Sequence, residues 1–160
     1  GLIGGALGGV VGCRIWQIPM IPFANASAIS LAVGQAIGRV GCFLVGDDYG
    51  RATDLPWGVA FPNGLPPVDY PVHPTMLYET LWLSLVAGYL WIRRRKSPSL
   101  MGEYLILNGI GRAVIEHWRL NARVALDLSE AQWIGMALIF FGLVLWVRAR
   151  TRGDRVETAA

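Results

Sequence analysis

The sequence predicts an all-α fold, a polytopic membrane bundle of about five transmembrane helices with an outer-face loop segment. Hydrophobic residues make up 54% of the 160 residues and charged residues 16%, against roughly 25% charged in ordinary soluble domains. The apolar residues gather in blocks close to the roughly 20 residues that cross hydrocarbon as a helix. Basic residues concentrate in short segments between and after these blocks. This pattern excludes a disordered chain and a disulfide-stapled secreted module.

The apolar blocks are expected to form helices in chain order. The first block, residues 1–13, has no initiator Met and no basic segment before it, so it is interpreted as the remainder of a longer span in a fragment, not as a signal peptide. The later blocks are Ser27–Val45, Met76–Ile92, Leu100–Trp118 and Ala131–Val147. Glycines recur through the first two blocks and are expected to let helices pack closely: Gly4, Gly5, Gly8, Gly9, Gly12, Gly34, Gly38 and Gly41.

The basic segments predict the orientation. By the positive-inside rule, Arg14, the loop 93–96 and a basic tail at 148–160 are expected to be cytoplasmic. Five crossings then alternate within one membrane domain, 1–160, and place the segment 46–75 and the short loop around Asn121 on the periplasmic side. Aromatic residues are expected near that outer boundary: Trp57, Tyr70, Trp118 and Trp133. The basic segments favour contact with anionic membrane lipids, and no nucleic-acid partner is expected.

The cysteines and histidines of the sequence do not predict a metal site. Cys13 and Cys42 form no CxxC and no other metal-ligand spacing, and His73 and His117 are too few for a structural zinc. No metal or cofactor is therefore expected, and each cysteine is interpreted as a small apolar helix residue.

Arg39 is the first charge that a membrane helix should not carry. It lies in GRVGCFLVGDDYG at 38–50, several residues before the outer end of its apolar block. A guanidinium there must meet an anion or a water-filled cavity, because it cannot be neutralised. Snorkelling to the outer interface, or a structural pair with an acid, explains Arg39 equally well.

A second charged cluster is GRAVIEHWR at 111–119. Arg112, Glu116 and Arg119 are spaced by four and three residues, which predicts one helix face. An intrahelical Arg112–Glu116 ion pair is one interpretation, and Arg119 then leaves a surplus positive charge. Alternatively, Arg112 and Arg39 come from different helices near the same leaflet and form an anion site, for which phosphate is suited by bidentate contacts.

The third cluster, HPTMLYE at 73–79, starts a helix at Pro74 and carries Glu79 into the membrane. Glu79 either interacts with the helix N-terminus or orients an arginine or binds a hydroxyl. The preceding Pro/Gly loop at 55–62 is interpreted as an interfacial cap. Together the clusters predict a cationic cavity open to the outer leaflet, with a lipid phosphate on the arginines. A lipid-handling enzyme, a lipid transporter and an anion channel all fit that prediction.

These segments resemble the bacterial prolipoprotein diacylglyceryl transferase family. GRVGCFLVGDDYG, PWGVAFP at 56–62, HPTMLYE and GRAVIEHWR occur in the family's order, and the GLIGG start resembles the residues just after the family's His-Gly-Gly motif, whose histidine would lie upstream. The resemblance implies a multi-pass enzyme of the bacterial plasma membrane with its active site toward the periplasmic leaflet. It implies transfer of the diacylglyceryl group of phosphatidylglycerol to the lipobox cysteine of a preprolipoprotein, with release of glycerol phosphate and no cofactor. A paralogue that binds or translocates anionic phospholipid is the alternative, followed by a structural partner subunit.

The resemblance also assigns expected roles to residues. Arg39 and Arg112 match the family's two key arginines and Glu116 the acid one turn later, so these three are the expected catalytic residues. Substrate binding is expected of Arg39, Asp47, Gly50, His73, Tyr78, Glu79 and Arg119. Departures from the family pattern are Cys42 for Asn, Met76 for Gln, Asn108 for Tyr and Ala113 for Phe. These departures affect the expected choice of acceptor more than the expected binding of phospholipid. They leave open a divergent branch of the family with another acceptor or lipid, or a paralogue of reduced activity.

Overall fold

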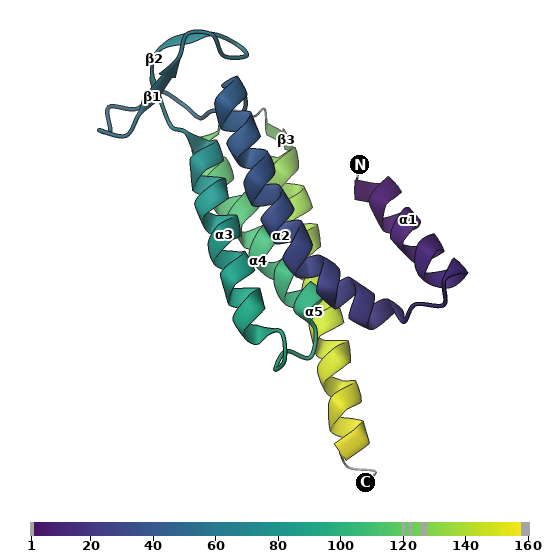
Figure 1. The fold of residues 1–160 in the computed structure, drawn as a ribbon. Helices are drawn as coiled ribbons and strands as arrows, with labels where there is room; N and C mark the ends of the chain where they lie inside the picture. Colours follow the sequence, from purple (N-terminus) through teal and green to yellow (C-terminus); the bar gives the residue numbers. More distant parts are fainter. Residues whose placement is uncertain (1, 120, 122, 126–127, 158–160) are drawn as a thin grey trace.

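Five helices form most of the structure, which is a computed structural model (Figure 1). It describes the backbone of residues 2–119, 121, 123–125 and 128–157, and the side chains of 4–119, 121 and 128–151. The helices are α1 (Leu2–Ile15), α2 (Met20–Val45), α3 (Thr75–Arg93), α4 (Leu100–Ile115) and α5 (Glu130–Glu157). Helices α2 to α5 pack side by side and alternate in direction, whereas α1 lies beside this bundle.

The predicted helical blocks are confirmed as helices, with different bounds. Helix α2 begins at Met20, seven residues before the predicted start. Pro19 and Pro22 do not prevent this, because both fall at the N-terminus of the helix, where a missing N–H is tolerated. Two described helices, α2 and the part of α5 from 130 to 151, are long and apolar enough to cross a membrane. These apolar helices support a membrane location.

Two short hairpins were not predicted. Strands β1 (Val59–Phe61) and β2 (Val68–Val72) pair antiparallel in the loop segment 46–75, and β3 (Arg123–Ala125) pairs with β4 (Leu128–Ser129). The first hairpin has its own small core, in which Phe61 packs against the rings of Phe43 and Tyr49. The segment 46–75 is thus a packed cap over one end of the bundle, here called the loop end (Figure 1).

The prediction that glycines in the first two blocks mediate helix packing was wrong for most of them. Among the described residues, a Cβ would meet nothing within 4 Å at Gly4, Gly5, Gly8, Gly34, Gly38 and Gly41. The close glycine contacts join α4 to α5 instead. A Cβ on Gly109 would lie 2.5 Å from the Gly135 carbonyl oxygen, and one on Gly142 would lie 2.7 Å from that of Gly102. Glycine spacing predicts a close approach, but it does not say which helix is the neighbour.

Trp82 fixes the contact between α3 and α4 near the loop end. Its indole Nε1 donates a hydrogen bond of 3.0 Å to the Leu107 carbonyl oxygen. The same ring lies over Gly111, where a Cβ would be only 2.2 Å from Nε1. Glycine at 111 therefore lets the indole lie against α4, and this contact forms part of the wall of a cavity between α2, α3 and α4.

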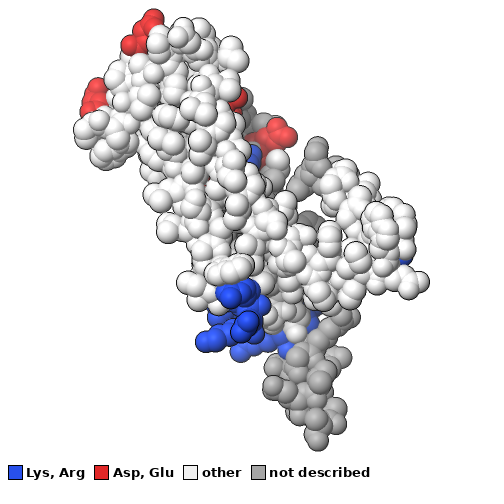
Figure 2. Space-filling model, in the orientation of Figure 1, with Lys and Arg blue, Asp and Glu red and all other residues white. Residues whose placement is uncertain are grey.

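Charge is segregated along the bundle (Figure 2). Lys and Arg gather at the end formed by the α3–α4 turn, here called the basic end, while the acidic residues visible on this face lie toward the loop end. The predicted orientation, with the basic segments in the cytoplasm, depends on this separation of charge. In the predicted tail 148–160, the side chains from Arg152 onward lie outside the described residues.

Candidate functional site

The cavity between α2, α3 and α4 has a volume of about 290 Å³. Helix α2 contributes Arg39 and Cys42, α3 contributes Glu79 and Trp82, and α4 contributes Asn108 and Arg112. The sequence predicted that Arg39 and Arg112 come together from different helices, and the structure confirms this. We call this site the arginine cavity.

Arg39 is held by two acids. Its Nε forms an ion pair with Glu79 Oε2, and its Nη1 lies 2.8 Å from Asp48 Oδ2. Arg119 joins the same network, with Nη2 at 3.1 Å from Asp48 Oδ2 and 3.9 Å from Glu79 Oε2. Two guanidinium groups and two carboxylates thus balance one another. The ion-pair interpretation of Arg39 is confirmed, although Arg39 also lines the cavity.

Arg112 has no such counter-ion. None of the described acids forms an ion pair with it, and its Nε is buried without a hydrogen-bond partner in the described part of the chain. The alternative of an Arg112–Glu116 pair is not realised, since Glu116 Oε1 accepts a hydrogen bond of 2.8 Å from Asn121 Nδ2. An arginine inside a membrane protein requires an anionic partner or water. Arg112 therefore gives the cavity an unpaired positive charge among the described residues, which an anion or water could satisfy.

The prediction that Arg112, Glu116 and Arg119 share one helix face was wrong. Helix α4 ends at Ile115, the turn η1 (Glu116–Trp118) is a 3-10 helix, and Arg119 is extended. This change of backbone directs Arg119 to the acids near α2 and α3, whereas Arg112 lines the cavity without pairing to a described acid. Helical periodicity holds only while the helix continues.

Gly50 joins the three segments that carry the charged residues. Its N–H donates to the His73 carbonyl oxygen at 2.8 Å, and the next residue, Arg51, donates from its N–H to the Trp118 carbonyl oxygen at 2.9 Å. A Cβ on Gly50 would lie 2.5 Å from that oxygen. Gly50 was expected to bind substrate; in the structure it allows a close backbone approach, because a Cβ does not fit between these segments.

Asp48 supplies the acid that meets the arginines, whereas Asp47, which was expected to bind substrate, forms no ion pair with them among the described residues. Gly46 ends α2 at a φ of 73°, and Asp48 itself has a φ of 61°. Thr75 Oγ1 donates a hydrogen bond of 2.6 Å to the Asp48 carbonyl oxygen and holds this turn. Burial raises the pKa of the Asp48 carboxyl, but Arg119 and Arg39 outweigh it and lower that pKa below its ordinary value.

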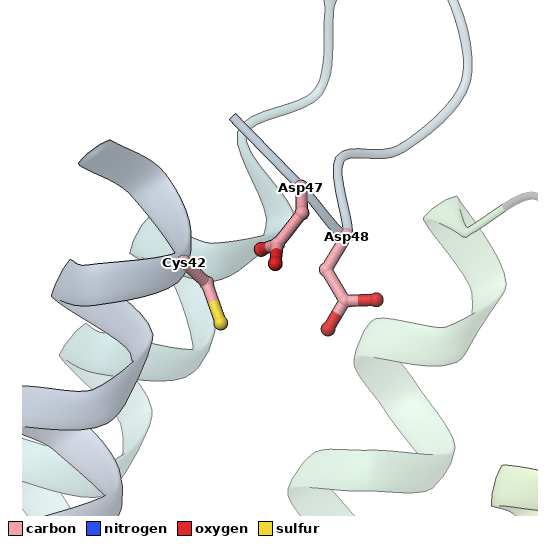
Figure 3. A group of neighbouring side chains, drawn as sticks. All are labelled: Cys42, Asp47 and Asp48. Atoms are coloured by element: carbon pink, nitrogen blue, oxygen red, sulfur yellow. The ribbon is translucent and has the colours of Figure 1, made fainter. Parts of the chain in front are cut away.

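Asp47 lies beside Cys42 at the edge of the cavity (Figure 3). Its Oδ1 is buried and has no hydrogen-bond partner among the described residues. The ligand atoms of Cys42, Asp47 and Asp48 lie within 4.8 Å of one another, which is metal-ligand spacing. Asp48 is already paired with two arginines, and Arg39 Nη1 is 3.9 Å from Cys42 Sγ. These cations would repel a metal ion, so the trio does not fit a metal site.

His73 and Tyr78 form an aromatic cluster outside the arginine cavity. His73 Nδ1 lies 3.1 Å from the Tyr78 hydroxyl, which accepts a hydrogen bond of 2.8 Å from Trp57 Nε1. The Trp118 ring contacts the rings of His73 and Tyr78. Burial lowers the pKa of His73, and Arg51 lowers it further, so the imidazole is neutral at pH 7. His73 and Tyr78, which were expected to bind substrate, thus lie outside the arginine cavity.

An apolar groove adjoins the arginine cavity. It has a volume of about 210 Å³, runs between α3 and α4, and is lined by Tyr78, Leu81, Trp82, Leu85, Ile110, Gly111, Val114 and Ile115. The groove and the cavity share Trp82, Gly111 and Ile115. A cationic cavity beside an apolar groove suits an amphiphile with a phosphate head. Sequence reasoning missed Trp82, although its spacing of three from Glu79 on α3 is the signal that could have found it.

The residues that depart from the family pattern fall into different environments. Asn108 Nδ2 donates to Gln35 Oε1 at 3.2 Å and to the Tyr104 hydroxyl at 3.0 Å, so it links α4 to α2 at the cavity. Cys42 also lines the cavity, whereas Met76 is fully buried in the core beneath the hairpin. Ala113 does not line the cavity either, so of the four departures Asn108 and Cys42 bear directly on what the cavity binds.

Known proteins resemble this chain over most of its length. A model of the family described as "Prolipoprotein diacylglyceryl transferase" matches residues 1–148. A Clostridium tetani relative is 33% identical over 150 residues, covering 91% of this chain and 60% of the relative. A Desulfotalea psychrophila relative is 33% identical over 155 residues (88% and 56%), and a Nostoc relative 34% identical over 175 residues (99% and 62%). All three bear the name phosphatidylglycerol–prolipoprotein diacylglyceryl transferase, and the chain spans about three-fifths of their length. The chain belongs to the prolipoprotein diacylglyceryl transferase family.

Proposed function

We propose that the protein transfers the diacylglyceryl group of phosphatidylglycerol to the lipobox cysteine thiol of a preprolipoprotein, releasing glycerol phosphate. The observation that carries this proposal is Arg112, a cavity arginine without an acid partner among the described residues, beside the balanced Arg39. The relatives' names supply the two substrate classes, phosphatidylglycerol and prolipoprotein.

In this proposal the arginines act on the phosphate. The acceptor sulfur, as a thiolate, forms a C–S bond to the terminal glyceryl carbon, and the C–O bond to the phosphate breaks. The electron pair leaves with glycerol phosphate, whose charge increases as the bond breaks. Arg112 and Arg39 stabilise that charge, which is the kind of preorganised electrostatic term that dominates many enzymes. No metal or cofactor takes part.

The remaining site residues position this pair. Glu79, with Asp48, holds Arg39, and Arg119 balances both acids. Gly50 keeps the three segments together. For Glu116 we propose a positioning role through Asn121 rather than contact with the substrate.

Three further residues are proposed to act at the edges of the site. Asp47 borders the acceptor side next to Cys42, and its unpartnered Oδ1 can accept a hydrogen bond from the peptide. His73 and Tyr78 support the end of the apolar groove. The groove takes an acyl chain of the lipid while its phosphate lies in the cavity.

The charge distribution supports the proposed topology. In it, five helices of one membrane domain, 1–160, cross the bacterial plasma membrane. The loop segment 46–75 faces the periplasm, and the basic end with the tail 148–160 faces the cytoplasm. The site then lies toward the periplasmic leaflet. The alternating directions of α2 to α5 and the segregated charges are consistent with this arrangement.

A reconstituted transfer reaction tests the function. The full-length protein is supplied with phosphatidylglycerol and a synthetic lipobox peptide, and the peptide mass is recorded. We expect a diacylglyceryl increment that is absent with a Cys→Ser peptide and falls by at least about 10²-fold in Arg112→Ala. Arg94→Ala removes the same charge at the basic end and is the matched control. A folded protein that binds phosphatidylglycerol without transferring the diacylglyceryl group would favour the non-catalytic alternative. Cys42→Asn and Asn108→Tyr, which restore the family residues, would then be the first variants to test for transfer.

A further inference from the structure

A second cavity lies at the basic end of the bundle, away from the arginine cavity. Its volume is about 330 Å³, and it is formed by α3, α4 and α5. Its lining includes Arg93 and Glu103 together with the apolar side chains of Ile106, Leu107 and Leu143. We call it the basic-end cavity. Nothing in the proposed transfer reaction uses it.

Two arginine–aromatic pairs flank this cavity. The Arg93 guanidinium lies 5.9 Å from the centre of the Tyr89 ring on α3, and the Arg150 guanidinium lies 5.3 Å from that of Trp146 on α5. Both rings line the cavity. Arg93 thus lines the cavity itself, and Arg150 lies over one of the rings that line it. A cation on each side of an apolar pocket suits a phosphate joined to a hydrocarbon chain.

A buried acid holds one of these arginines in place. The Glu103 side chain is 8% exposed, and its Oε1 accepts hydrogen bonds from Arg93 Nη2 at 2.8 Å and from Ser97 Oγ at 2.9 Å. Glu103 Oε2 and Arg93 Nε are buried and lack hydrogen-bond partners among the described residues. Unsatisfied buried polar atoms are costly, so this pair also indicates a ligand that offers both a donor and an acceptor.

We propose that the basic-end cavity binds an anionic phospholipid that does not react there, at a site separate from the transfer reaction. Its phosphate lies on Arg93 and Arg150, a head-group hydroxyl donates to Glu103, and an acyl chain lies along Ile106 and Leu143. Basic pockets between membrane helices bind anionic head groups in this way. The loop 93–96 adds positive charge at the same end, so the anionic lipid is favoured over a zwitterionic one.

Photo-crosslinking separates this site from the arginine cavity. The full-length protein is placed in nanodiscs with phosphatidylglycerol or phosphatidylcholine that carries a diazirine on the same acyl chain, and adducts are mapped by peptide mass spectrometry. We expect adducts at Ile106, Leu107 and Leu143, several-fold more abundant with phosphatidylglycerol. They should persist in Arg112→Ala, because that residue belongs to the other cavity. Equal labelling by the two lipids would overturn the proposal.

Matched charge variants distinguish a built site from general attraction. Arg93→Gln with Arg150→Gln should abolish the preference for phosphatidylglycerol. Arg94→Gln with Arg95→Gln removes two charges from the same end and should keep it, since Arg94 lies over the exposed Trp91 outside the cavity. An equal loss in both double variants would contradict the inference.

Two further variants avoid disturbing the buried acid. Arg93→Gln leaves Glu103 without its cation, so Arg150→Gln alone provides a variant in which that pair is intact. Leu143→Trp fills the cavity from α5 without changing any charge. Both should lower the adduct yield several-fold, and unchanged labelling in both would refute the proposal.

Discussion

A methyl group added at Gly111 tests whether Trp82 is wedged against α4. In Gly111→Ala the new Cβ would lie 2.2 Å from Trp82 Nε1 and 2.3 Å from its Cδ1. Ordinary contacts between such atoms are about 3.5–4.0 Å, so the indole must move by more than about 1 Å. That movement breaks the 3.0 Å hydrogen bond to the Leu107 carbonyl oxygen and changes the wall shared by the arginine cavity and the apolar groove.

The expected loss of stability is set by these contacts. Overpacking costs roughly 1–3 kcal/mol, and the lost hydrogen bond about 0.5–1.5 kcal/mol. Alanine is also a better helix former than glycine by about 1 kcal/mol. Gly88→Ala on α3 is the matched control, because it receives the same gain in helix propensity and its Cβ meets no described atom within 4 Å. Gly111→Ala should therefore be less stable than Gly88→Ala by about 1.5–4.5 kcal/mol.

Thermal unfolding in one detergent measures this difference. We expect the melting temperature of Gly111→Ala to lie at least about 3 °C below that of Gly88→Ala. Transfer to the lipobox peptide should fall in Gly111→Ala and stay near the parent value in Gly88→Ala. If the two variants melt together and transfer equally well, Trp82 does not depend on glycine at 111, and the proposed link between the cavity and the groove is refuted.

Three other predictions concern the charged network and its backbone. Glu79→Gln should lower the free energy of unfolding by about 3–5 kcal/mol, because it breaks a buried ion pair. Asp48→Asn should lower it by about 1 kcal/mol or less, because that side chain is 48% exposed. Equal melting temperatures of the two variants would contradict this expectation. The folded-state pKa of Asp48 is lowered, so its stabilisation should be complete above about pH 5 and be lost as the pH falls below about 4; melting curves of the parent and Asp48→Asn should then converge at the acid end. Gly50→Ala should abolish transfer and lower the melting temperature, because its Cβ would lie 2.5 Å from a carbonyl oxygen; a parent-like variant would show that the segments do not meet there.

The helices were predictable because their signals are local. Each apolar block is a continuous run of residues, and hydrophobic burial depends on composition more than on the partner. The hairpin β1–β2 was missed because strand pairing depends on residues that lie apart in the chain, here Val59 with Val72. The glycines of the first two blocks were assigned a packing role for the same reason, since spacing does not identify the neighbour.

The sequence predicted the main residues of the candidate site, but it did not predict which acid pairs with which arginine. Arg39, Glu79 and Arg112 stand out because charges are rare in apolar helices, and the structure brings all three to one cavity. The choice between Asp47 and Asp48 depends on the left-handed end of α2 at Gly46, which the sequence allows but does not specify.

The sequence by itself determined that this is a helical membrane protein with charge segregated between its ends, because hydropathy and charge are properties of short segments. The tertiary structure decided which acid neutralises which arginine. Arg119 reaches Asp48, 71 residues away, only because α4 ends at Ile115 and the chain meets the loop at Gly50. Helical periodicity would have kept Arg119 in line with Arg112. Because the helix stops first, Arg119 pairs with the acids, and Arg112 lines the cavity without an acid partner among the described residues.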